Sequence, residues 1–375
     1  MSLAIEESDE QSRRKSRWGI SGPLDVVGLW IDERTGFIGP IRSFLTYPVP
    51  KYVHKNLLYS LGGLSLISFL LQITSGMLLS FYYDPSPAEA YNSVDYVTYQ
   101  VPLGWLMRGL HYYNASAIVI LVALHLLRTF SFSAYKKPRE ITWLSGVLLL
   151  LVSLGFAFTG YLLPWDQKGY WATKVGIEIA SSAPLVGEWV GRLVRGGPTL
   201  GQATLTRFYV THMLLLPAAL VMLIGLHIHQ LRYHGMAPSI TKRGQALSGK
   251  FVPFFPHWVV VDATLGVIVL GLLIYLSWSQ RAPLEFPADP TSTDFLPRPE
   301  WYFLFLFQLL KYFPGPLEPI ATVLIPSVII GSILLLPFVD RSEERRPWRK
   351  PITTGVAVFY LVLIITLTLL ALKAG

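Results

Sequence analysis

Long apolar runs separated by shorter polar stretches dominate this sequence. Each run holds about 20 or more residues with few charges, which is the length a helix needs to cross the ~30 Å hydrocarbon layer of a membrane. Backbone groups in lipid must be hydrogen-bonded within the segment, so helices are expected rather than strands. We predict an all-α integral membrane protein with seven transmembrane helices over residues 57–82, 105–130, 141–163, 208–231, 258–278, 317–337 and 352–372.

Two polar stretches outside these spans have helical patterns of their own. Residues 24–36 predict a short amphipathic helix on the membrane surface. The segment between the third and fourth spans has about 44 residues and therefore has room for short helices.

Charge sets the expected orientation. Only 14% of the residues are charged, against about 25% in soluble domains. Lys and Arg concentrate in the segments after the second, fourth and sixth spans, whereas those after the first and fifth are richer in Asp and Glu. The N-terminus is therefore expected on the cytoplasmic (negative) side and the C-terminus on the positive side. The segment between the third and fourth spans, which is also basic, fits this rule poorly.

Two further bulk properties narrow the chemistry. The formal net charge of +8 could indicate nucleic acid, but basic residues that lie mostly in loops on one membrane side favour orientation in a membrane and no nucleic-acid partner. The chain has no Cys, which excludes disulfides, cysteine-ligated iron–sulfur clusters and thioether-linked heme within it.

Four histidines lie on the second and fourth spans at nearly matched spacing. His111 and His125 are 14 residues apart, and His212 and His227 are 15 apart. At about 100° per residue, a gap of 14 returns to nearly the same helix face ~21 Å further along. A gap of 15 misses that face by about 60°, which a kink at Pro217 could absorb. Because both helices run in the same direction, the imidazoles predict two bis-histidine heme sites, one near each membrane face.

The alternative for any single histidine is a hydrogen-bonded residue of the helix bundle, and paired spacing favours ligands over that alternative. The remaining histidines project to another face or lie at the ends of spans. They are expected not to be ligands: His54, His229, His234 and His257.

Glycines repeat the period in the neighbouring spans. Gly62 and Gly76 are 14 apart on the first span, and Gly146 and Gly160 are 14 apart on the third. This predicts places where a porphyrin plane presses on the backbone, the alternative being ordinary packing of small residues. Other expected heme contacts include arginines that would pair with propionates, for which snorkelling to the interface is the alternative. This set comprises Arg108, Arg128, Arg232 and Gln72.

These features resemble the cytochrome b subunit of the cytochrome bc complexes, from about residue 24 onward. The resemblance rests on the histidine and glycine pairs and on four sequence motifs. These are GYLLPWDQKGYW (160–171), RFYVTH (207–212), KKPRE (136–140) and PEWY (299–302). The cytochrome b6f type is the most similar branch, given the 15-residue gap and seven spans. In that branch a Cys before Leu-Gly-Gly holds an extra heme. Ser60 stands there instead, so only a non-covalent third heme stays open.

The resemblance implies a domain organisation in which b6-like and subunit-IV-like parts are fused. The expected parts are a cytoplasmic segment with a surface helix (1–45), a four-helix domain with two non-covalent b hemes (46–235), a linker (236–252) and a three-helix domain with the PEWY segment (253–375).

The resemblance also implies an activity. Quinol would be oxidised on the positive side, between the segment joining spans three and four and the segment joining spans five and six. One electron would go to a Rieske iron–sulfur protein and a c-type cytochrome. The other would cross the hemes to reduce quinone on the negative side, with proton translocation. The implied setting is a homodimeric catalytic complex in a bacterial-type energy-transducing membrane.

Quinol oxidation needs a proton acceptor beside an apolar pocket, and Glu300 is the expected one. Its alternative is a carboxylate at a helix N-terminus. Tyr161 and Tyr302 would act with it, beside Pro164, Trp165, Pro299 and Trp301. For the negative-side quinone site the candidates are His257 and Asp262, with His234 and Lys250 nearby, and each of these is more often structural than functional.

Two other interpretations stay open at this point. Another diheme membrane cytochrome, such as a dehydrogenase anchor or a b561-like reductase, would not require the PEWY segment or the last three spans. A transporter would need no paired histidines and would be colourless when purified.

Overall fold

The computed structural model describes residues 23–51, 56–237, 251–292, 294–296 and 298–374. The chain divides into two compact units, residues 1–55 with 249–263, and residues 56–248 with 264–375. Most of the predicted linker, residues 238–250, lies outside the described residues.

The larger unit is helical, and the seven predicted spans are confirmed within the described residues. The fourth begins at Gln202, earlier than predicted, because its apolar run is preceded by a helical polar turn. The spans are η2–α4 (Leu57–Ser80), α6 (Gly104–Ser131), α7 (Glu140–Gly160), α10–η3–α11 (Gln202–His234), α12 (His257–Gln280), η5–η6–α14 (Gly315–Val339) and α15 (Pro351–Lys373).

Shorter elements connect these spans. The segment between the third and fourth spans contains two short helices, as predicted. The connecting elements are α5 (Ala90–Tyr99), α8 (Gln167–Ser181), α9 (Gly187–Arg195), η4 (Trp301–Phe303), α13 (Leu304–Leu310) and η7 (Pro347–Arg349).

The smaller unit contains a helix where the sequence predicted one at residues 24–36; it runs as α2 (Pro23–Thr35) and is followed by α3 (Ile38–Leu45). A two-stranded antiparallel sheet follows, β1 (Pro48–Pro50) with β2 (Phe251–Pro253). Three-residue strands with a proline at an end carry no alternating pattern, so the sequence did not predict this sheet. The first turns of α12 complete the unit.

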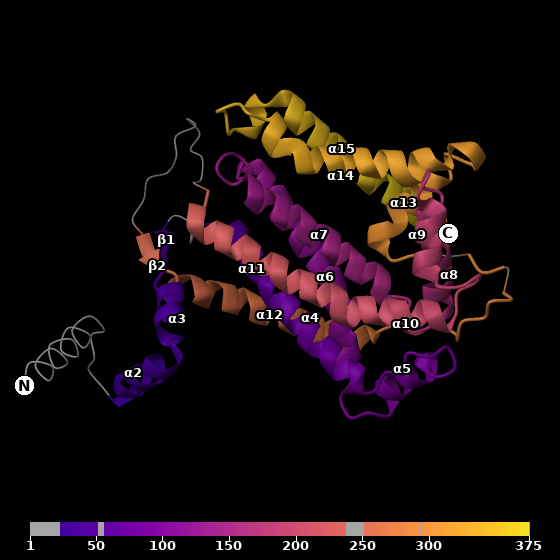
Figure 1. Cartoon of the computed structure of the whole chain (residues 1–375), viewed down its shortest axis with the longest axis horizontal. Helices are drawn as coiled ribbons and strands as arrows, with labels where there is room; N and C mark the ends of the chain where they lie inside the picture. The colour runs from indigo at the N-terminus through magenta and orange to yellow at the C-terminus, as the bar shows by residue number, and fades with distance from the viewer. Residues whose placement is uncertain (1–22, 52–55, 238–250, 293, 297, 375) are drawn as a thin grey trace, which may run out of the picture. The chain divides into compact units, whose positions relative to one another are not determined.

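Four spans pack into a bundle that holds all the predicted heme ligands. Helix α6 contacts α4 and α7, and α11 contacts α7; Figure 1 shows α6, α7 and α11 running alongside one another. Ser65 and Ser153 lie inside the bundle and donate to carbonyls one turn back, at 2.8 and 2.7 Å, which satisfies their hydroxyls without water. The apolar core of the bundle is Phe69, Ile118, Val122, Leu149 and Leu220.

The fourth span accommodates its 15-residue histidine gap by a π turn. Proline at 217 has no N–H to donate to the carbonyl of Met213, and the π turn η3 (Thr211–Leu215) directly precedes it. A π turn holds one residue more than an α turn, so a 15-residue gap that contains one behaves as a gap of 14. The register adjustment expected at Pro217 is therefore made by a π turn at the first histidine of the pair. A second π turn, η6 (Ile320–Leu324), precedes Pro326 in the same way.

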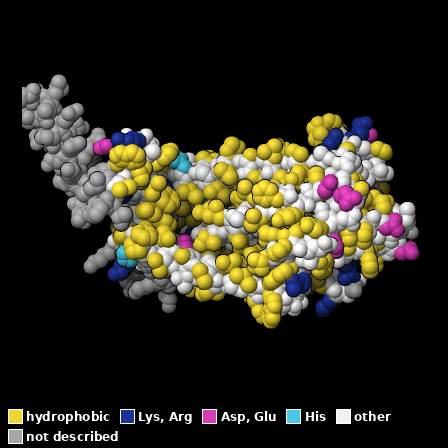
Figure 2. Space-filling view, turned by 90° about the horizontal axis from the view of Figure 1, so that it is seen from below, with side chains coloured by type: hydrophobic (Ala, Val, Ile, Leu, Met, Phe, Trp, Pro, Cys, Tyr) yellow, Lys and Arg dark blue, Asp and Glu magenta, His cyan; other side chains and the backbone are white. Residues whose placement is uncertain are grey.

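The C-terminal helices pack on the bundle through α7 and α14. Trp143 on α7 donates its indole N–H to the carbonyl of Ile333 on α14 at 2.7 Å. Helices α13 and α15 and the π turn η6 share a small apolar cluster built on Leu309, Ala321 and Leu367. The face shown in Figure 2 is covered largely by apolar side chains over the spans, as expected for surfaces that meet lipid.

A buried charge cluster joins the segments on the predicted cytoplasmic side. Asp340, just after α14, pairs with Lys136 of the KKPRE motif at 2.8 Å and with Lys350 at 3.2 Å, and Tyr135 donates to the same carboxylate. All three charged side chains are at most 8% exposed. Although burial opposes ionisation, the hydrogen bonds from Lys136 and Tyr135 hold the pKa of Asp340 well below its usual range. The cluster holds the segment after α6 against the segment after α14.

Candidate functional site

Two pairs of imidazoles face each other inside the four-helix bundle. The ring centroids of His111 and His212 are 6.3 Å apart, and those of His125 and His227 are 6.4 Å apart. A metal–imidazole bond is ~2 Å long, so two such bonds plus a ring radius at each end span roughly 6 Å. The separations therefore fit one metal ion held between each pair, which is the geometry of six-coordinate heme with two axial histidines.

Each of the four periodic glycines makes room for one of these imidazoles. A Cβ on Gly160 would lie 2.7 Å from Cε1 of His212, and one on Gly76 would lie 3.0 Å from Cε1 of His111. Gly62 and Gly146 stand in the same relation to the other pair, at 3.1 and 3.2 Å. The sequence predicted backbone close to a porphyrin. The group that the glycines accommodate here is the imidazole edge, whose position a side chain at the glycine would displace.

Hydroxyl side chains fix the outward nitrogen of three histidines. Each hydroxyl donates to a carbonyl of its own helix and thus accepts from Nδ1–H of the histidine, which leaves Nε2 with a lone pair for a metal. These hydroxyl residues were not predicted from the sequence, although each directly precedes one of the four glycines. The Oγ–Nδ1 distances are 3.1 Å for Ser75 and His111, 2.9 Å for Ser145 and His227, and 3.0 Å for Thr159 and His212.

A second group of residues surrounds Glu300, which precedes η4. Its carboxylate lies 2.7 Å from the ammonium of Lys168 on α8 and 3.5 Å from the hydroxyl of Tyr112 on α6. The Glu300 side chain is 16% exposed. Because Tyr112 follows His111 directly, this carboxylate contacts the residue next to the first imidazole pair.

The PWDQK turn and the segment after α12 are joined by backbone hydrogen bonds in this region. Gln167 donates its N–H to the carbonyl of Phe286 at 2.9 Å, and Ala288 donates to the carbonyl of Trp165 at 3.0 Å. Asp166 accepts from the N–H of Gly169 at 2.8 Å and so caps α8. Burial raises the pKa of Asp166, and the hydrogen bonds from the backbone oppose that rise.

Aromatic rings line the same region. Tyr161 contacts Phe303 with ring centroids 6.4 Å apart, and Tyr302 contacts Phe303 at 5.0 Å. Burial raises the pKa of Tyr161 and of Tyr302 above the usual range, so both stay protonated phenols at neutral pH. Trp301 donates its indole N–H to Ser116 at 3.3 Å, and Pro299 is buried. Pro164 and Trp165 lie on the PWDQK turn, where Trp165 is buried.

The predicted cofactor contacts outside the histidines and glycines have protein partners. Arg108 is buried and donates to the carbonyls of Ala282, at 2.8 Å, and of Pro283. The guanidinium of Arg128 lies 3.8 Å from the ring centre of Tyr59. Arg232 is partly buried in the last turn of α11.

Gln72 lies on α4 and bonds to α6. It donates to the carbonyl of His111 at 3.0 Å and accepts from Asn114 at 2.8 Å. It therefore holds α4 against α6 at the level of the first imidazole pair.

The candidates for the negative-side quinone site do not all lie in one unit of the chain. His257 is exposed and Asp262 is buried in the first turns of α12, within the smaller unit. The carbonyl of His234 accepts from Arg139 at 3.0 Å. His54 and Lys250 lie outside the described residues.

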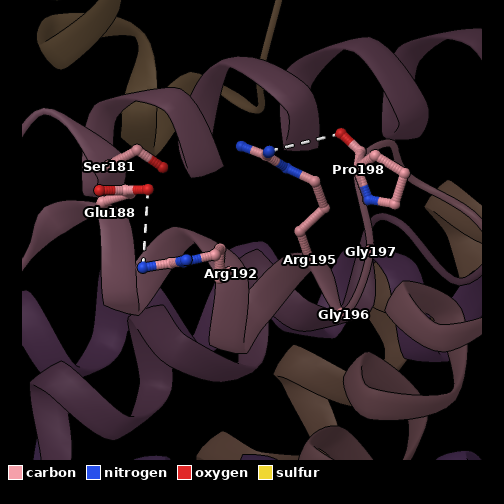
Figure 3. Close-up of a pocket in the computed structure, with 7 residues that line it drawn as sticks. All are labelled: Ser181, Glu188, Arg192, Arg195, Gly196, Gly197 and Pro198. Carbon is pink, nitrogen blue, oxygen red and sulfur yellow. Dashed lines mark hydrogen bonds and ion pairs between the residues drawn. The ribbon is translucent and has the colours of Figure 1, made fainter.

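A pocket of about 590 Å³ lies at α9 and the loop after it, and it contains none of the predicted site residues (Figure 3). Its acidic and basic side chains pair locally, with Arg192 3.5 Å from Glu188 on the same helix. Because none of the residues that line it belongs to the imidazole pairs or to the group around Glu300, this pocket is separate from both.

Comparison with known proteins decides the family. The profile "Cytochrome b/b6/petB" matches residues 44–235, and "Cytochrome b(C-terminal)/b6/petD" matches residues 287–374. The chain belongs to the cytochrome b/b6 family. It carries the b6-like and petD-like parts of that family in one polypeptide, as predicted. This membership decides against both a transporter and an unrelated diheme cytochrome.

Individual members of the family agree with the profiles. The cytochrome bc complex cytochrome b subunit of Chlorobaculum thiosulfatiphilum is 38% identical over 350 residues, which is 91% of this chain and 80% of that protein. Cytochrome b6 of Synechococcus sp. (strain JA-3-3Ab) is 42% identical over 56% of this chain and 96% of its own length. A solved structure, "Hyperthermophilic respiratory Complex III", superposes with a TM-score of 0.79 at 31% identity, covering 91% of this chain and 90% of the other.

Proposed function

We propose that the chain is the catalytic cytochrome b subunit of a quinol:cytochrome c or plastocyanin-type oxidoreductase. The observation that carries the proposal is the presence of two facing imidazole pairs in one bundle of a cytochrome b/b6 family member, with Glu300 in contact with Tyr112, the residue next to the first pair. An assembly that moves electrons across a membrane needs redox sites near both faces and a substrate site near at least one, and hemes at the two imidazole pairs with quinol near Glu300 would give this chain that arrangement.

Two non-covalent b hemes fit the imidazole pairs. His111 with His212 would hold one, and His125 with His227 would hold the other. When bound there, the hemes supply one-electron carriers without an open coordination position for oxygen. Further contacts are proposed from the arginines, for the heme propionates, and from Gln72 and the glycines along the bundle: Arg108, Arg128, Arg232, Gln72, Gly62, Gly76, Gly146 and Gly160.

Quinol oxidation releases two protons and two electrons, and the residues around Glu300 suit the proton transfer. As a carboxylate, Glu300 can accept a proton from a quinol hydroxyl. The ammonium of Lys168 lies 2.7 Å from this carboxylate and pairs with it in a largely apolar setting. The phenols of Tyr161 and Tyr302 can donate hydrogen bonds to quinone oxygens, and apolar walls would come from Pro164, Trp165, Pro299 and Trp301.

The proposed complex needs further components and a second quinone site. Electrons from quinol would divide between a Rieske iron–sulfur protein with its c-type cytochrome and the b hemes. Quinone reduction on the negative side would involve His257 and Asp262. The same proposal places the chain in a homodimeric complex of a bacterial energy-transducing membrane, with a cytoplasmic N-terminus, lipid around its spans and proton translocation as its output.

The direct test is a heme count combined with reduction by quinol. A pyridine hemochrome assay of the purified complex should give two b hemes per chain, and added quinol should reduce them in the absence of other donors. A ratio of one or none would contradict the ligand assignment. Two hemes that quinol fails to reduce would contradict the substrate.

The glycines give a sharper prediction about the first site. Gly160→Val would place side-chain atoms where a Cβ already lies 2.7 Å from His212, so the imidazole must move and its heme should be lost. We expect the heme-to-protein ratio to fall from two to about one. Gly225→Val on the same helix as His227 is the control, because no atom beyond its chain neighbours and the nearby backbone of its own helix lies within 4 Å of its Cβ position, and it should keep two hemes. Full heme content in Gly160→Val would show that the space left by Gly160 is not needed for heme binding.

A further inference from the structure

The four predicted heme histidines differ in the partners of their outward nitrogen, Nδ1. Three of them meet both a hydroxyl on the residue before a periodic glycine and the backbone carbonyl four residues before that glycine. The hydroxyl and the carbonyl are also bonded to each other, so each histidine faces a small closed network. The three networks are Ser75 and Gln72 for His111, Thr159 and Phe156 for His212, and Ser145 and Thr142 for His227.

His125 is the exception. The glycine that accommodates it is Gly62, and the residue before that glycine is Leu61, which has no hydroxyl. Nδ1 of His125 is buried and has no hydrogen-bond partner among the described residues. The chain thus builds an acceptor for three imidazoles and leaves the fourth without one.

The start of helix α4 explains why the carbonyl is missing as well. Gly62 is only the second residue of α4, whereas each of the other three glycines is preceded by more than one full turn of its own α-helix. The residue four positions before Gly62 is Leu58, which lies in the 3₁₀ turn Leu57–Ser60 rather than in an α turn. Its carbonyl therefore does not occupy the place that the Gln72 carbonyl occupies for His111. The hydroxyl of Ser60 is one residue too early in the sequence and has no partner among the described residues.

Acceptors on Nδ1–H change the electronic character of a metal-bound imidazole. A hydrogen bond from Nδ1–H raises the basicity of the ligand, stabilises the more positive oxidised metal and lowers the reduction potential. Resting on the function proposed above, we propose that Leu61 tunes the heme at His125 and His227. By leaving one axial imidazole without an acceptor, it raises the reduction potential of that heme. The effect favours residence of the electron at the His125 site over the His111 site, toward the negative side.

The test is a redox titration of the purified complex carrying Leu61→Ser, followed at the heme α-bands. This variant restores the hydroxyl–glycine order seen for the other three histidines. One hydrogen bond is worth roughly a three- to tenfold change in an equilibrium constant, or about 30 to 60 mV for one electron. We expect the midpoint of one heme to fall by that amount and that of the other to stay unchanged.

Two further variants make the outcome decisive. Thr159→Val keeps the shape but removes an acceptor from His212, so it should raise the midpoint of the other heme. Ser60→Ala should change neither midpoint. Unshifted midpoints in Leu61→Ser or in Thr159→Val would overturn the proposal, as would a shift in Ser60→Ala, because Ser60 would then already serve His125. An unmodified complex that contains no heme would instead contradict the proposed function. Failure of the Leu61 proposal and failure of the proposed function therefore give different results.

Discussion

Replacing His212 by alanine should remove one of the two b hemes and abolish quinol oxidation, the largest functional loss expected from any single side chain here. His212 faces His111 at 6.3 Å, and without it the iron would keep one protein ligand in a bundle with no nearby substitute. Within the described residues no group of three or more His, Cys, Asp or Glu side chains could take over as a metal site. The pyridine hemochrome ratio should fall from two to about one, and quinol-dependent reduction of the remaining heme should fall to background.

The control for this variant is His229→Ala on the same span. His229 is exposed and its ring stacks on Tyr233, away from either imidazole pair, so both hemes and full turnover should remain. A His212→Ala protein that keeps two hemes would remove His212 from the ligand set. A His212→Ala protein that loses one heme yet oxidises quinol at the normal rate would show that the first heme is not needed for quinol oxidation.

The spans and the histidine pairs could be predicted because both follow from one-dimensional patterns. Apolar runs of membrane length fix the helices, and a 14-residue period fixes a shared face whatever the helices pack against. The π turn at Thr211–Leu215 shows the limit of this reasoning. The 15-residue gap indicated that the helix register had to be adjusted. A proline can be accommodated by a kink or by a π turn, however, and the local sequence does not determine which of the two occurs.

Contacts between distant segments could not be predicted in this way. Lys168 and Glu300 are 132 residues apart, and Lys136 and Asp340 are 204 apart, so no local periodicity relates them. From the sequence, Lys168 was only a loop charge that fitted the orientation rule poorly. Its place beside Glu300 gives a physical reason for a lysine on the positive side, because it neutralises a carboxylate that would otherwise be costly to partly bury.

The hydroxyl partners of the histidines are an intermediate case. Ser75, Ser145 and Thr159 each directly precede a periodic glycine, so the signal was present in the sequence. It became interpretable only when the structure showed that the glycine faces the imidazole edge rather than open space. The preceding residue is then one helical step away and can reach Nδ1.

Replacing Glu300 by glutamine should slow quinol oxidation by about 10² to 10⁴ while both hemes are retained, the range for loss of a positioned proton acceptor. Glutamine keeps the shape and can still accept a hydrogen bond from Lys168, but it cannot take up a proton at neutral pH. Glu300 contacts Tyr112 and Lys168, and neither is a proposed heme ligand, so the imidazole pairs should be undisturbed. Steady-state quinol-dependent reduction of cytochrome c, with the heme ratio measured on the same sample, gives both readouts.

Glu89→Gln is the matched control, since Glu89 is an exposed carboxylate on the same predicted side of the membrane. It receives the same chemical change and should keep normal turnover. Because the first proton must leave before the quinol can give up its electrons at low energy, the Glu300 variant should also lose pre-steady-state heme reduction by quinol. Reduction of the hemes by dithionite should stay complete in that variant. Normal heme reduction by quinol in Glu300→Gln would place the proton acceptor elsewhere, and incomplete reduction by dithionite would mean that the substitution had damaged the heme sites themselves.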